Sequence, residues 1–228
     1  MNGPLSSFDD LLYDLTPRAT TITLAFDDPR IKPLVSLRLI QKILESQKSV
    51  IYLDFDLLFS SFLQNLESSE LDREINNRNL IVMQPTDDIL EFIRNIAFEK
   101  MKQGGALILD SLNSLQNLLN DDEISRGSKE ANQKTALVVT VLQNMCRYYG
   151  KSLIVFNITK SRPRNLDEKS MSFWEKTLVG GRMIRFKSDA ILSVKQDSLD
   201  AFLIEVIVQE LRNGNPKDSS KAKYRFRV

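Results

Sequence analysis

The 228-residue sequence contains no histidine and a single cysteine, Cys146. Histidine general bases, Ser-His-Asp triads, Cys-His pairs and zinc sites built from cysteine or histidine are therefore excluded. The lone cysteine also rules out a framework of intrachain disulfides. Glycine is scarce as well, because only eight occur and none lies between residues 4 and 103. Any phosphate-binding loop within those hundred residues would have to form without glycine.

Long apolar runs are also absent. No stretch approaches the roughly 18 to 20 apolar residues that a membrane helix requires. The first seven residues have neither the basic segment nor the apolar core of a signal peptide. We therefore expect a cytoplasmic protein without a membrane partner.

The net charge is only +1, but the charges are unevenly distributed. Residues 160–188 hold eight cations against three acids, and residues 211–228 hold six against one, so each segment carries +5. The other 181 residues therefore carry −9. Two basic segments on an acidic body favour a localised anionic partner over general adhesion.

Short apolar runs alternate with longer amphipathic stretches along most of the chain. The runs predict strands at 20–26, 49–54, 80–83, 106–110 and 152–157. The amphipathic stretches predict helices at 34–46, 57–66, 87–102 and 130–149. An antiparallel all-β tail is expected at 190–194, 202–208 and 222–228.

This alternation predicts an α/β fold, with a mainly parallel sheet flanked by helices and extended by antiparallel C-terminal strands. No internal repeat or linker divides the chain. We therefore expect a single domain over residues 1–228, in which 1–19 form a short N-terminal extension.

Acidic residues stand at the carboxyl ends of three predicted strands, where parallel sheets bind their ligands. They are Asp27 and Asp28, Asp54 and Asp56, and Asp110. The run at 104–112 has the form of a Walker B strand, whose aspartate holds a magnesium-bound water. A buried strand that ends in a helix-capping or turn aspartate gives the same pattern, so both interpretations stay open here.

Several further motifs follow one another in a characteristic order. They are VIYLDFDLLF at 50–59, SRG at 125–127, FNITKSRP at 156–163, LVGGR at 178–182 and ELRNGNP at 210–216. In their order and spacing the chain resembles the RecA/RadA recombinase superfamily, in particular archaeal RadA paralogs that consist of the core domain alone. The resemblance runs from about residue 20 to the C-terminus and implies a RecA-like core. It also places Asp56 on the catalytic glutamate of the family.

The residues after the first core strand depart from the family's phosphate-binding loop, G-x-x-x-x-G-K-T/S. In that loop glycines let the backbone amides surround the phosphates, and the lysine meets the terminal phosphates. Lys32 falls on the lysine, but Phe26 and Ile31 replace the glycines and Pro33 replaces the magnesium-binding hydroxyl. The degenerate nucleotide site then consists of Asp27, Asp28, Lys32 and Pro33.

We therefore expect no ATP or magnesium cofactor and no metal site, so that Asp56 and Asp110 are remnants of a catalytic site. The change from glutamate to Asp56 also withdraws a water-activating carboxylate by about one methylene. The alternative is an ATPase with a divergent phosphate loop centred on Lys32, in which Asp110 serves magnesium and Asp56 is the base.

The remaining candidate activity is binding by the basic segment at 160–187, which the resemblance places on the second DNA-binding loop of recombinases. Lys and Arg neutralise phosphates, and an exposed Trp can stack on an unpaired base. Alternatively, Phe173 and Trp174 close a small hydrophobic core and the cations only solvate a loop. The predicted DNA-binding residues are Lys160, Arg162, Arg164, Lys169, Trp174, Lys176, Arg182 and Arg185.

The basic C-terminal segment has two interpretations as well. Its cations alternate with Tyr224 and Phe226, so they are either a further anion-binding surface or the solvent face of an edge strand, where lysines discourage aggregation. The cations are Lys217, Lys221, Lys223, Arg225 and Arg227.

These observations favour an ATPase-inactive accessory protein, similar to RadA paralogs, that modulates homologous recombination or DNA repair. It would bind DNA, in single-stranded form, or a RadA-type recombinase or another paralog. No helix-hairpin-helix domain is expected, and the FDDL at 8–11 does not match the family's F-x-x-A polymerisation segment. Besides the ATPase, a KaiC-like protein-interaction module without DNA binding remains an alternative.

Overall fold

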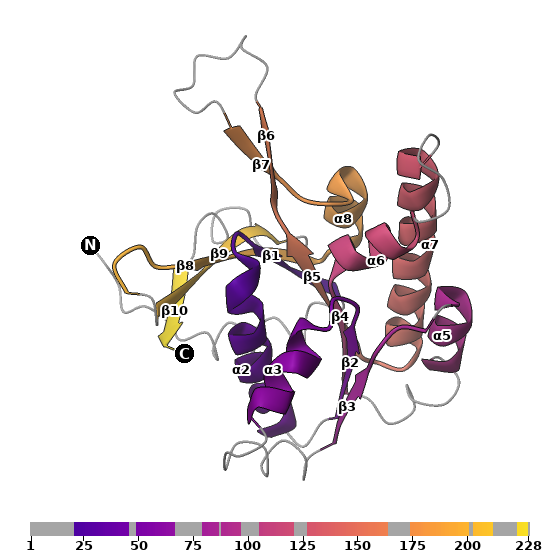
Figure 1. Cartoon of the computed structure of the whole chain (residues 1–228), viewed down its shortest axis with the longest axis horizontal. Coiled ribbons are helices and arrows are strands. Elements are labelled where there is room, and N and C mark those ends of the chain that lie inside the picture. Colours follow the sequence, from indigo (N-terminus) through magenta and orange to yellow (C-terminus); the bar gives the residue numbers. More distant parts are fainter. Residues whose placement is uncertain are drawn as a thin grey trace.

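The computed structural model describes residues 21–45, 49–66, 79–86, 88–96, 105–120, 127–163, 174–200, 203–211 and 223–227. The predicted extension at 1–19 lies outside these residues. The described part forms one large sheet with helices on both faces and a small two-stranded arm (Figure 1).

Eight strands make up the large sheet. They are β1 (Thr21–Phe26), β2 (Val50–Asp54), β3 (Leu80–Met83), β4 (Ala106–Asp110), β5 (Ser152–Ile158), β8 (Ala190–Gln196), β9 (Leu203–Leu211) and β10 (Lys223–Arg227). Their spatial order is β10-β9-β8-β1-β5-β4-β2-β3. The strands from β3 to β8 run parallel, and β9 and β10 are antiparallel to their neighbours. The predicted α/β class and mainly parallel sheet are thus confirmed.

Two helices, α2 (Lys32–Glu45) and α3 (Leu58–Leu66), cover one face of the sheet, and a short 3-10 turn, η1 (Pro29–Ile31), precedes α2. The other face carries α5 (Ile89–Asn95), α6 (Leu112–Leu118), α7 (Gly127–Tyr148) and α8 (Gly181–Lys187) (Figure 1). The two remaining strands, β6 (Lys160–Pro163) and β7 (Trp174–Thr177), form the arm, which projects from the body.

Two predictions for the second half of the chain were wrong. The segment at 160–187, expected to be a loop, contains the β6–β7 arm and helix α8. The tail at 190–228 is not entirely antiparallel, because β8 pairs in parallel with β1. Helix α8 returns the chain to the starting edge of the sheet, so β8 must run in the same direction as β1. A seven-residue helix gives too short a periodic signal to be recognised in the sequence.

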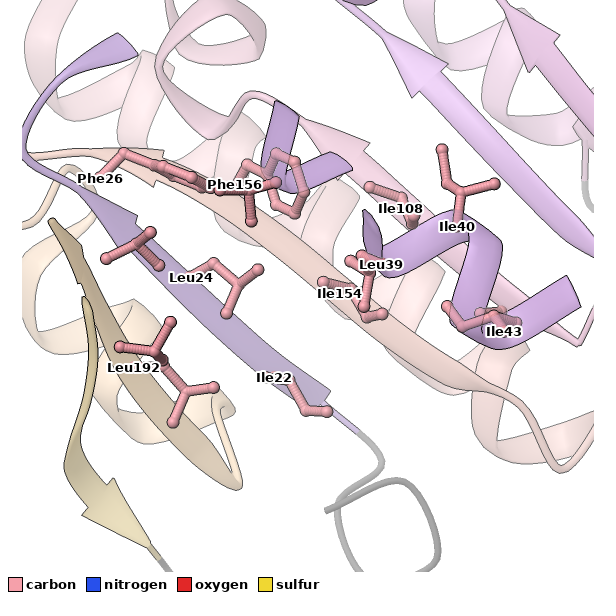
Figure 2. Packing of buried hydrophobic residues seen from close by; sticks show 14 of the residues in the cluster. Ile22, Leu24, Phe26, Leu39, Ile40, Ile43, Ile108, Ile154, Phe156 and Leu192 are labelled. Carbon is pink, nitrogen blue, oxygen red and sulfur yellow. The ribbon is translucent and has the colours of Figure 1, made fainter. Parts of the chain in front are cut away.

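Side chains of each central strand alternate between two hydrophobic cores. On β2, Val50 and Tyr52 face α2 and α3, whereas Ile51 and Leu53 face α7. The strands β4 and β5 follow the same alternation, with Ile108 and Phe156 on the α2 side (Figure 2). This period of two decides which helix meets each residue at the end of a strand.

Two predicted helix boundaries are confirmed. The Asp88 carboxylate accepts a hydrogen bond from the backbone N–H of Glu91 at 2.9 Å and caps α5. Its alternative, Asp87, and the expected continuation to residue 102 lie outside the described residues. Helix α7 ends before Gly150, whose φ of 61° favours glycine.

No helix of the described part of the chain combines the length and the apolar character needed to cross a membrane.

Candidate functional site at the carboxyl edge of the sheet

Asp54 and Asp110 end the neighbouring strands β2 and β4, where they are register partners. Each lies an even number of residues from side chains that pack against α2, namely Tyr52 and Ile108. The pleat therefore turns both carboxylates toward the face that α2 covers. Both are fully buried, at 0% and 1% exposure.

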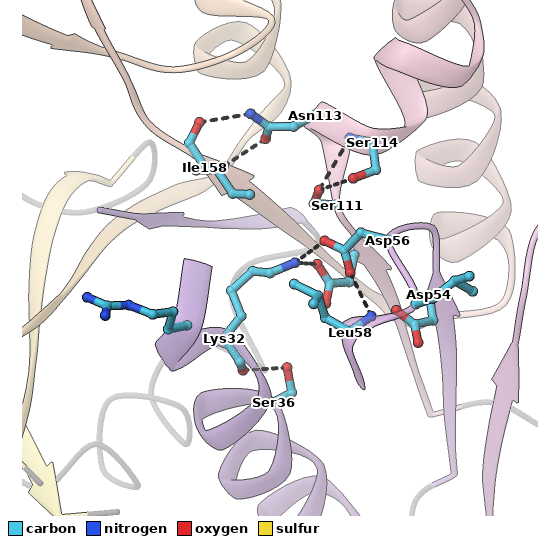
Figure 3. Close-up of polar contacts among 12 residues, drawn as sticks. Lys32, Ser36, Asp54, Asp56, Leu58, Ser111, Asn113, Ser114 and Ile158 are labelled. Carbon is cyan, nitrogen blue, oxygen red and sulfur yellow. Dashed lines mark hydrogen bonds and ion pairs between the residues drawn. The ribbon is translucent and has the colours of Figure 1, made fainter. Parts of the chain in front are cut away.

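Lys32, the first residue of α2, lies against these strand ends. Its side chain is completely buried, and its Nζ forms ion pairs with the Asp110 and Asp56 carboxylates (Figure 3). The structure thus brings together three residues that the sequence singled out, from β4, from α2 and from the turn after β2. An ammonium group so placed has its charge compensated within the protein.

Two residues that the sequence does not single out as site residues, Tyr52 and Ser36, complete this group. The Tyr52 hydroxyl donates a hydrogen bond to Oδ2 of Asp110 at 2.5 Å, and Ser36 Oγ lies 3.0 Å from the Tyr52 hydroxyl. Ser36 in turn donates to the backbone oxygen of Lys32 at 2.8 Å. A polar residue in the middle of the buried run VIYLD, two positions before Asp54, was the signal in the sequence, because it shares the face of that aspartate.

Asp54 holds the next helix and keeps one oxygen without a partner. Its Oδ2 accepts from the backbone N–H and the hydroxyl of Ser60, both at 2.6 Å, at the start of α3. Its buried Oδ1 has no hydrogen-bond partner among the described residues. One carboxylate oxygen from each of Asp54, Asp56 and Asp110 lies within 4.8 Å of the others.

Oxygen donors of this kind suit magnesium or calcium. The Lys32 ammonium, however, already lies against the Asp56 and Asp110 carboxylates as a built-in counter-cation.

Burial has the largest effect on the Asp110 carboxyl and raises its pKa to about 6. The Lys32 ammonium opposes this rise, and the Asp56 carboxylate adds to it. Burial, followed by the Asp110 charge, also raises the pKa of Tyr52 well above its ordinary value. The tyrosine therefore remains a hydrogen-bond donor to the aspartate at neutral pH.

Two backbone N–H groups at the junction of β1 and α2, those of Arg30 and Lys32, donate hydrogen bonds within the protein. The Asp28 carboxylate accepts from the backbone N–H of Arg30 at 2.9 Å and from the Arg30 guanidinium. The backbone N–H of Lys32 donates to the oxygen of Pro29. Pro29 and Pro33 have no N–H to offer. At a helix start, backbone N–H groups can bind a phosphate. Here the Asp28 carboxylate occupies that position instead.

Asp27 belongs to a different group. Its carboxylate accepts from the Thr159 hydroxyl at 3.0 Å and lies 3.9 Å from Nζ of Lys195. The predicted nucleotide-site residues therefore separate into two sets, with Asp27 and Asp28 in contacts outside the Lys32 cluster.

The arm carries the centre of the predicted DNA-binding segment. In its register Lys160 pairs with Thr177, Arg162 with Glu175, and Pro163 with Trp174. Arg164 and Lys169 lie outside the described residues, and only the backbone is described for Arg162, Trp174 and Lys176. Their roles as DNA contacts stay predictions.

Three predicted cations can be placed with their side chains. Lys160 at the root of the arm and Arg182 in α8 are exposed, and no carboxylate of the described residues pairs with either. Arg185 instead forms an exposed ion pair with Glu210 at 2.7 Å. The structure therefore leaves the first two as the stronger candidates for an external anion.

Two asparagine side chains hold the root of the arm. Asn113 of α6 donates to the backbone oxygen of Ile158 at 3.0 Å and accepts from its N–H at 2.7 Å. Asn157 does the same for Val179, at 2.8 and 3.1 Å. These paired hydrogen bonds copy those of a sheet and fix the chain where it leaves the body at Ile158 and where it returns at Val179. Figure 3 shows the pair between Asn113 and Ile158.

Gly180 precedes α8 with a φ of 76°. A Cβ atom at this position would lie 3.0 Å from a side-chain carbon of Ile184 and 3.1 Å from one of Met183. The positive φ therefore favours glycine here, and a larger residue would also have to displace these side chains by a few tenths of an ångström.

A cavity of about 580 Å³ opens beside this root, between α6, the start of α7, the arm and α8. Its residues are Gln116, Asn117, Asn120, Ala131, Asn132, Lys160, Thr177, Leu178, Val179, Gly180, Gly181 and Met183. Four carboxamides and one lysine thus surround it, and its volume lies in the range of small-ligand sites, about 300 to 1,000 Å³.

The described cations of the C-terminal segment are paired. Arg225 lies 3.1 Å from Glu205 and Arg227 lies 3.0 Å from Asp200, while Lys223 also approaches Glu205 at 3.5 Å. This alternation therefore belongs to the charged face of an edge strand, the second of the two interpretations. Lys217 and Lys221 lie outside the described residues.

No family model and no curated protein sequence matches the chain. Several solved structures, however, are similar to it in fold. One ATPase domain superposes with a TM-score of 0.65 at 14% identity, covering 98% of this chain and 88% of that one. A KaiC-like protein from Pyrococcus horikoshii gives 0.64 at 15% identity, with 99% and 96% covered. The RadB recombinase gives 0.60 at 15% identity, with 92% and 88% covered. The chain thus has the RecA-like fold that its motif order predicted.

Proposed function

We propose that the chain is an ATPase-inactive, RadA-paralog-like accessory protein that modulates homologous recombination or DNA repair. It binds single-stranded DNA, a RadA-type recombinase or another paralog, and uses neither ATP nor magnesium. The observation that carries this proposal is the buried Lys32 ammonium, which pairs with Asp56 and Asp110 at the position where a RecA-like ATPase would meet phosphates.

The energetics of that position argue against a nucleotide. To reach a phosphate, Lys32 would leave two carboxylates, one of them fully buried, without their counter-charge. Separating a buried ion pair costs about 3–5 kcal/mol, so the phosphate contacts would first have to offset that cost. The segment before α2 adds little to such contacts, since Asp28 and Pro29 already use its amides.

Features on the face of the sheet that carries α6, α7 and α8 support the proposal of DNA binding. The arm projects from the body, and exposed Lys160 and Arg182 lie near its root beside the cavity. Among the structural neighbours, one is a recombinase and one is a DnaB-like replicative helicase with 14% identity. Cations on a projecting arm can follow a phosphate backbone without reading its sequence.

Calorimetry with ATP and magnesium tests the first half of the proposal. The full chain is expected to give no binding heat up to millimolar nucleotide, with or without the Lys32→Ala substitution. Micromolar binding that disappears in Lys32→Ala would contradict it. That outcome would favour the alternative ATPase, for which the start of α2 at Lys32 and the three nearby carboxylates are the supporting observations.

Fluorescence anisotropy with single-stranded DNA at increasing salt tests the second half. Replacing both Arg162 and Arg164 with Gln is expected to weaken binding and to reduce the salt slope by about 1.4, at about 0.7 per lost phosphate contact. The matched control replaces Arg225 and Arg227, whose charges are paired with Glu205 and Asp200. The DNA assignment fails if no binding is detected at low salt.

The similarity to a KaiC-like protein supports the other alternative, a protein-interaction module without DNA binding. A pull-down with purified RadA-type recombinase discriminates the two. Recovery of the recombinase supports the accessory role, whereas a chain that binds neither recombinase nor DNA favours the interaction module.

A further inference from the structure

One side of helix α7 carries a continuous line of exposed residues. Residues 130, 134, 137, 141, 144 and 148 follow one another at alternating intervals of four and three, so they lie along one side of the helix. In Figure 1 α7 stands at the margin of the molecule. We call this line the outer seam of α7. Its residues, all exposed, are Glu130, Lys134, Leu137, Val141, Asn144 and Tyr148.

Three residues of the outer seam are large apolar or aromatic side chains that face water. Leu137 is 56% exposed, Val141 39% and Tyr148 82%. Single exposed apolar residues are common, but the solvent side of a helix normally carries polar residues along its whole length. A line of apolar residues that repeats about every 3.5 positions is instead typical of a helix that packs against a second helix.

The middle of the outer seam matches itself when a second α7 runs in the opposite direction. In such an antiparallel pair, Leu137 meets Val141 of the second copy, and the symmetry repeats this contact. In the same register Lys134 faces Asn144 of the second copy. The ammonium can donate to the carboxamide oxygen, so this layer is compatible with both side chains. The seam therefore has an apolar centre with a polar layer on each side.

The charged end of the outer seam favours the same orientation. Glu130 and Lys134 pair within the helix at 3.1 Å, and their side chains stay 62% and 46% exposed. In the antiparallel register Glu130 faces Tyr148 of the second copy, whose hydroxyl can donate to the carboxylate. A parallel pair would place Glu130 against Glu130 and Lys134 against Lys134. Contacts between like charges disfavour that arrangement.

We propose that two copies of the chain associate through the outer seam of α7 as an antiparallel helix pair with twofold symmetry. The interface is isologous, so each contact occurs twice. One helix pair buries less area than a standard interface, and we therefore expect a weak dimer with a dissociation constant on the order of 10 µM. This association is independent of the proposed function, because the Lys32 cluster lies on the other face of the sheet.

Sedimentation velocity of the full chain tests the association. The mass should rise from 26.1 kDa toward twice that value as the concentration increases from about 1 to about 100 µM. Leu137→Asp and Val141→Asp should each weaken the dimer at least about tenfold, because each buries two unpaired carboxylates in the interface. Both variants should keep the melting temperature of the monomer, since the two side chains are exposed in it.

The matched control is Leu199→Asp, which changes a leucine that is 96% exposed between β8 and β9, outside the outer seam. It should leave the dissociation constant unchanged. A chain that stays monomeric at about 100 µM, or a dimer that both α7 variants leave intact, overturns the proposal. A monomer whose complex with a RadA-type recombinase is lost in Leu137→Asp assigns the seam to that partner and also overturns it.

Disulfide cross-linking tests the orientation of the two helices. A mixture of Leu137→Cys and Val141→Cys chains should form a disulfide faster than either chain alone, because these positions face each other only in the antiparallel register. The native Cys146 is completely buried and does not compete. Faster cross-linking of Val141→Cys with itself would overturn the antiparallel pair.

Discussion

Two polar regions lie at the same edge of this sheet but on opposite faces, and they treat charge differently. On the α2 face, Lys32, Asp54, Asp56 and Asp110 are gathered with little or no contact with water. On the α6–α8 face, Lys160 and Arg182 are exposed beside an open, carboxamide-lined cavity. A charge that is compensated inside the protein stabilises one conformation. An exposed cation without a carboxylate partner remains available to bind a ligand.

Lys32→Met should have the largest effect on this contrast. It removes the only described cation of the buried cluster and leaves its carboxylates uncompensated, so we expect a loss of about 3–5 kcal/mol in unfolding free energy. Urea and thermal unfolding measure it, with a decrease of about 10 °C in melting temperature for a domain of this size.

The control for this variant is Arg30→Met, which removes an exposed cation two residues away and should leave the melting temperature nearly unchanged. Adding Asp110→Leu to Lys32→Met removes one uncompensated carboxylate and should recover part of the loss. Equal melting temperatures for the Lys32 and Arg30 variants would contradict the distinction between the two regions.

The second-largest effect that we expect is a dependence of the unfolding free energy on pH through Asp110. The pKa of Asp110 is raised to about 6 in the folded protein, mainly by burial, so the folded state holds this proton more tightly than the unfolded state. Its contribution to stability is therefore present at low pH and is lost as pH rises through about 6. Between pH 4 and pH 7 the loss amounts to up to about 3 kcal/mol.

Urea titrations of the unsubstituted protein and of Asp110→Asn across this range isolate that contribution. The stability of the unsubstituted protein relative to Asp110→Asn should fall as pH rises. A relative stability that increases with pH would instead mean that the Lys32 ion pair outweighs burial.

Substitutions on the open face should affect binding more than folding. Lys160→Gln and Arg182→Gln are each expected to reduce single-stranded DNA affinity about fivefold at 0.1 M salt, and the salt slope by about 0.7. Their melting temperatures should not change, because neither cation has a carboxylate partner among the described residues. Unchanged affinity in both variants would place the DNA contact elsewhere.

The smallest effect is expected from Arg185→Gln. This cation pairs with Glu210 at the surface, and such pairs contribute less than about 1 kcal/mol. We expect little change in unfolding free energy and none in DNA affinity. A drop in affinity as large as that of Arg182→Gln would show that the ion pair opens to receive DNA.

Much of this fold could be predicted from local signals. The apolar runs of β2, β4 and β5 gave their strands, and the sharp boundary at Gly150 gave the end of α7. Helices α6 and α8 were missed because seven residues give little periodicity. The sequence predicts a loop where the arm lies, because a four-residue strand with three polar residues has no clear alternation.

The sequence by itself determined the absence of histidine chemistry, the strand-helix order, and the set of acids at strand ends. It also indicated that the segment before α2 lacks glycine where a phosphate loop would need it. These properties depend only on residue type and on spacing along the chain, and these two determine the local backbone structure.

Only the tertiary structure decided how the charged residues are grouped. Lys32 and Asp110 are 78 residues apart, and their ion pair depends on β2 and β4 being neighbours and on α2 crossing their ends. The same packing separates Asp27 from that cluster and brings Gln116 and Asn132 to one cavity. Because charge compensation depends on distance and burial in three dimensions, no spacing along the chain could have assigned these partners.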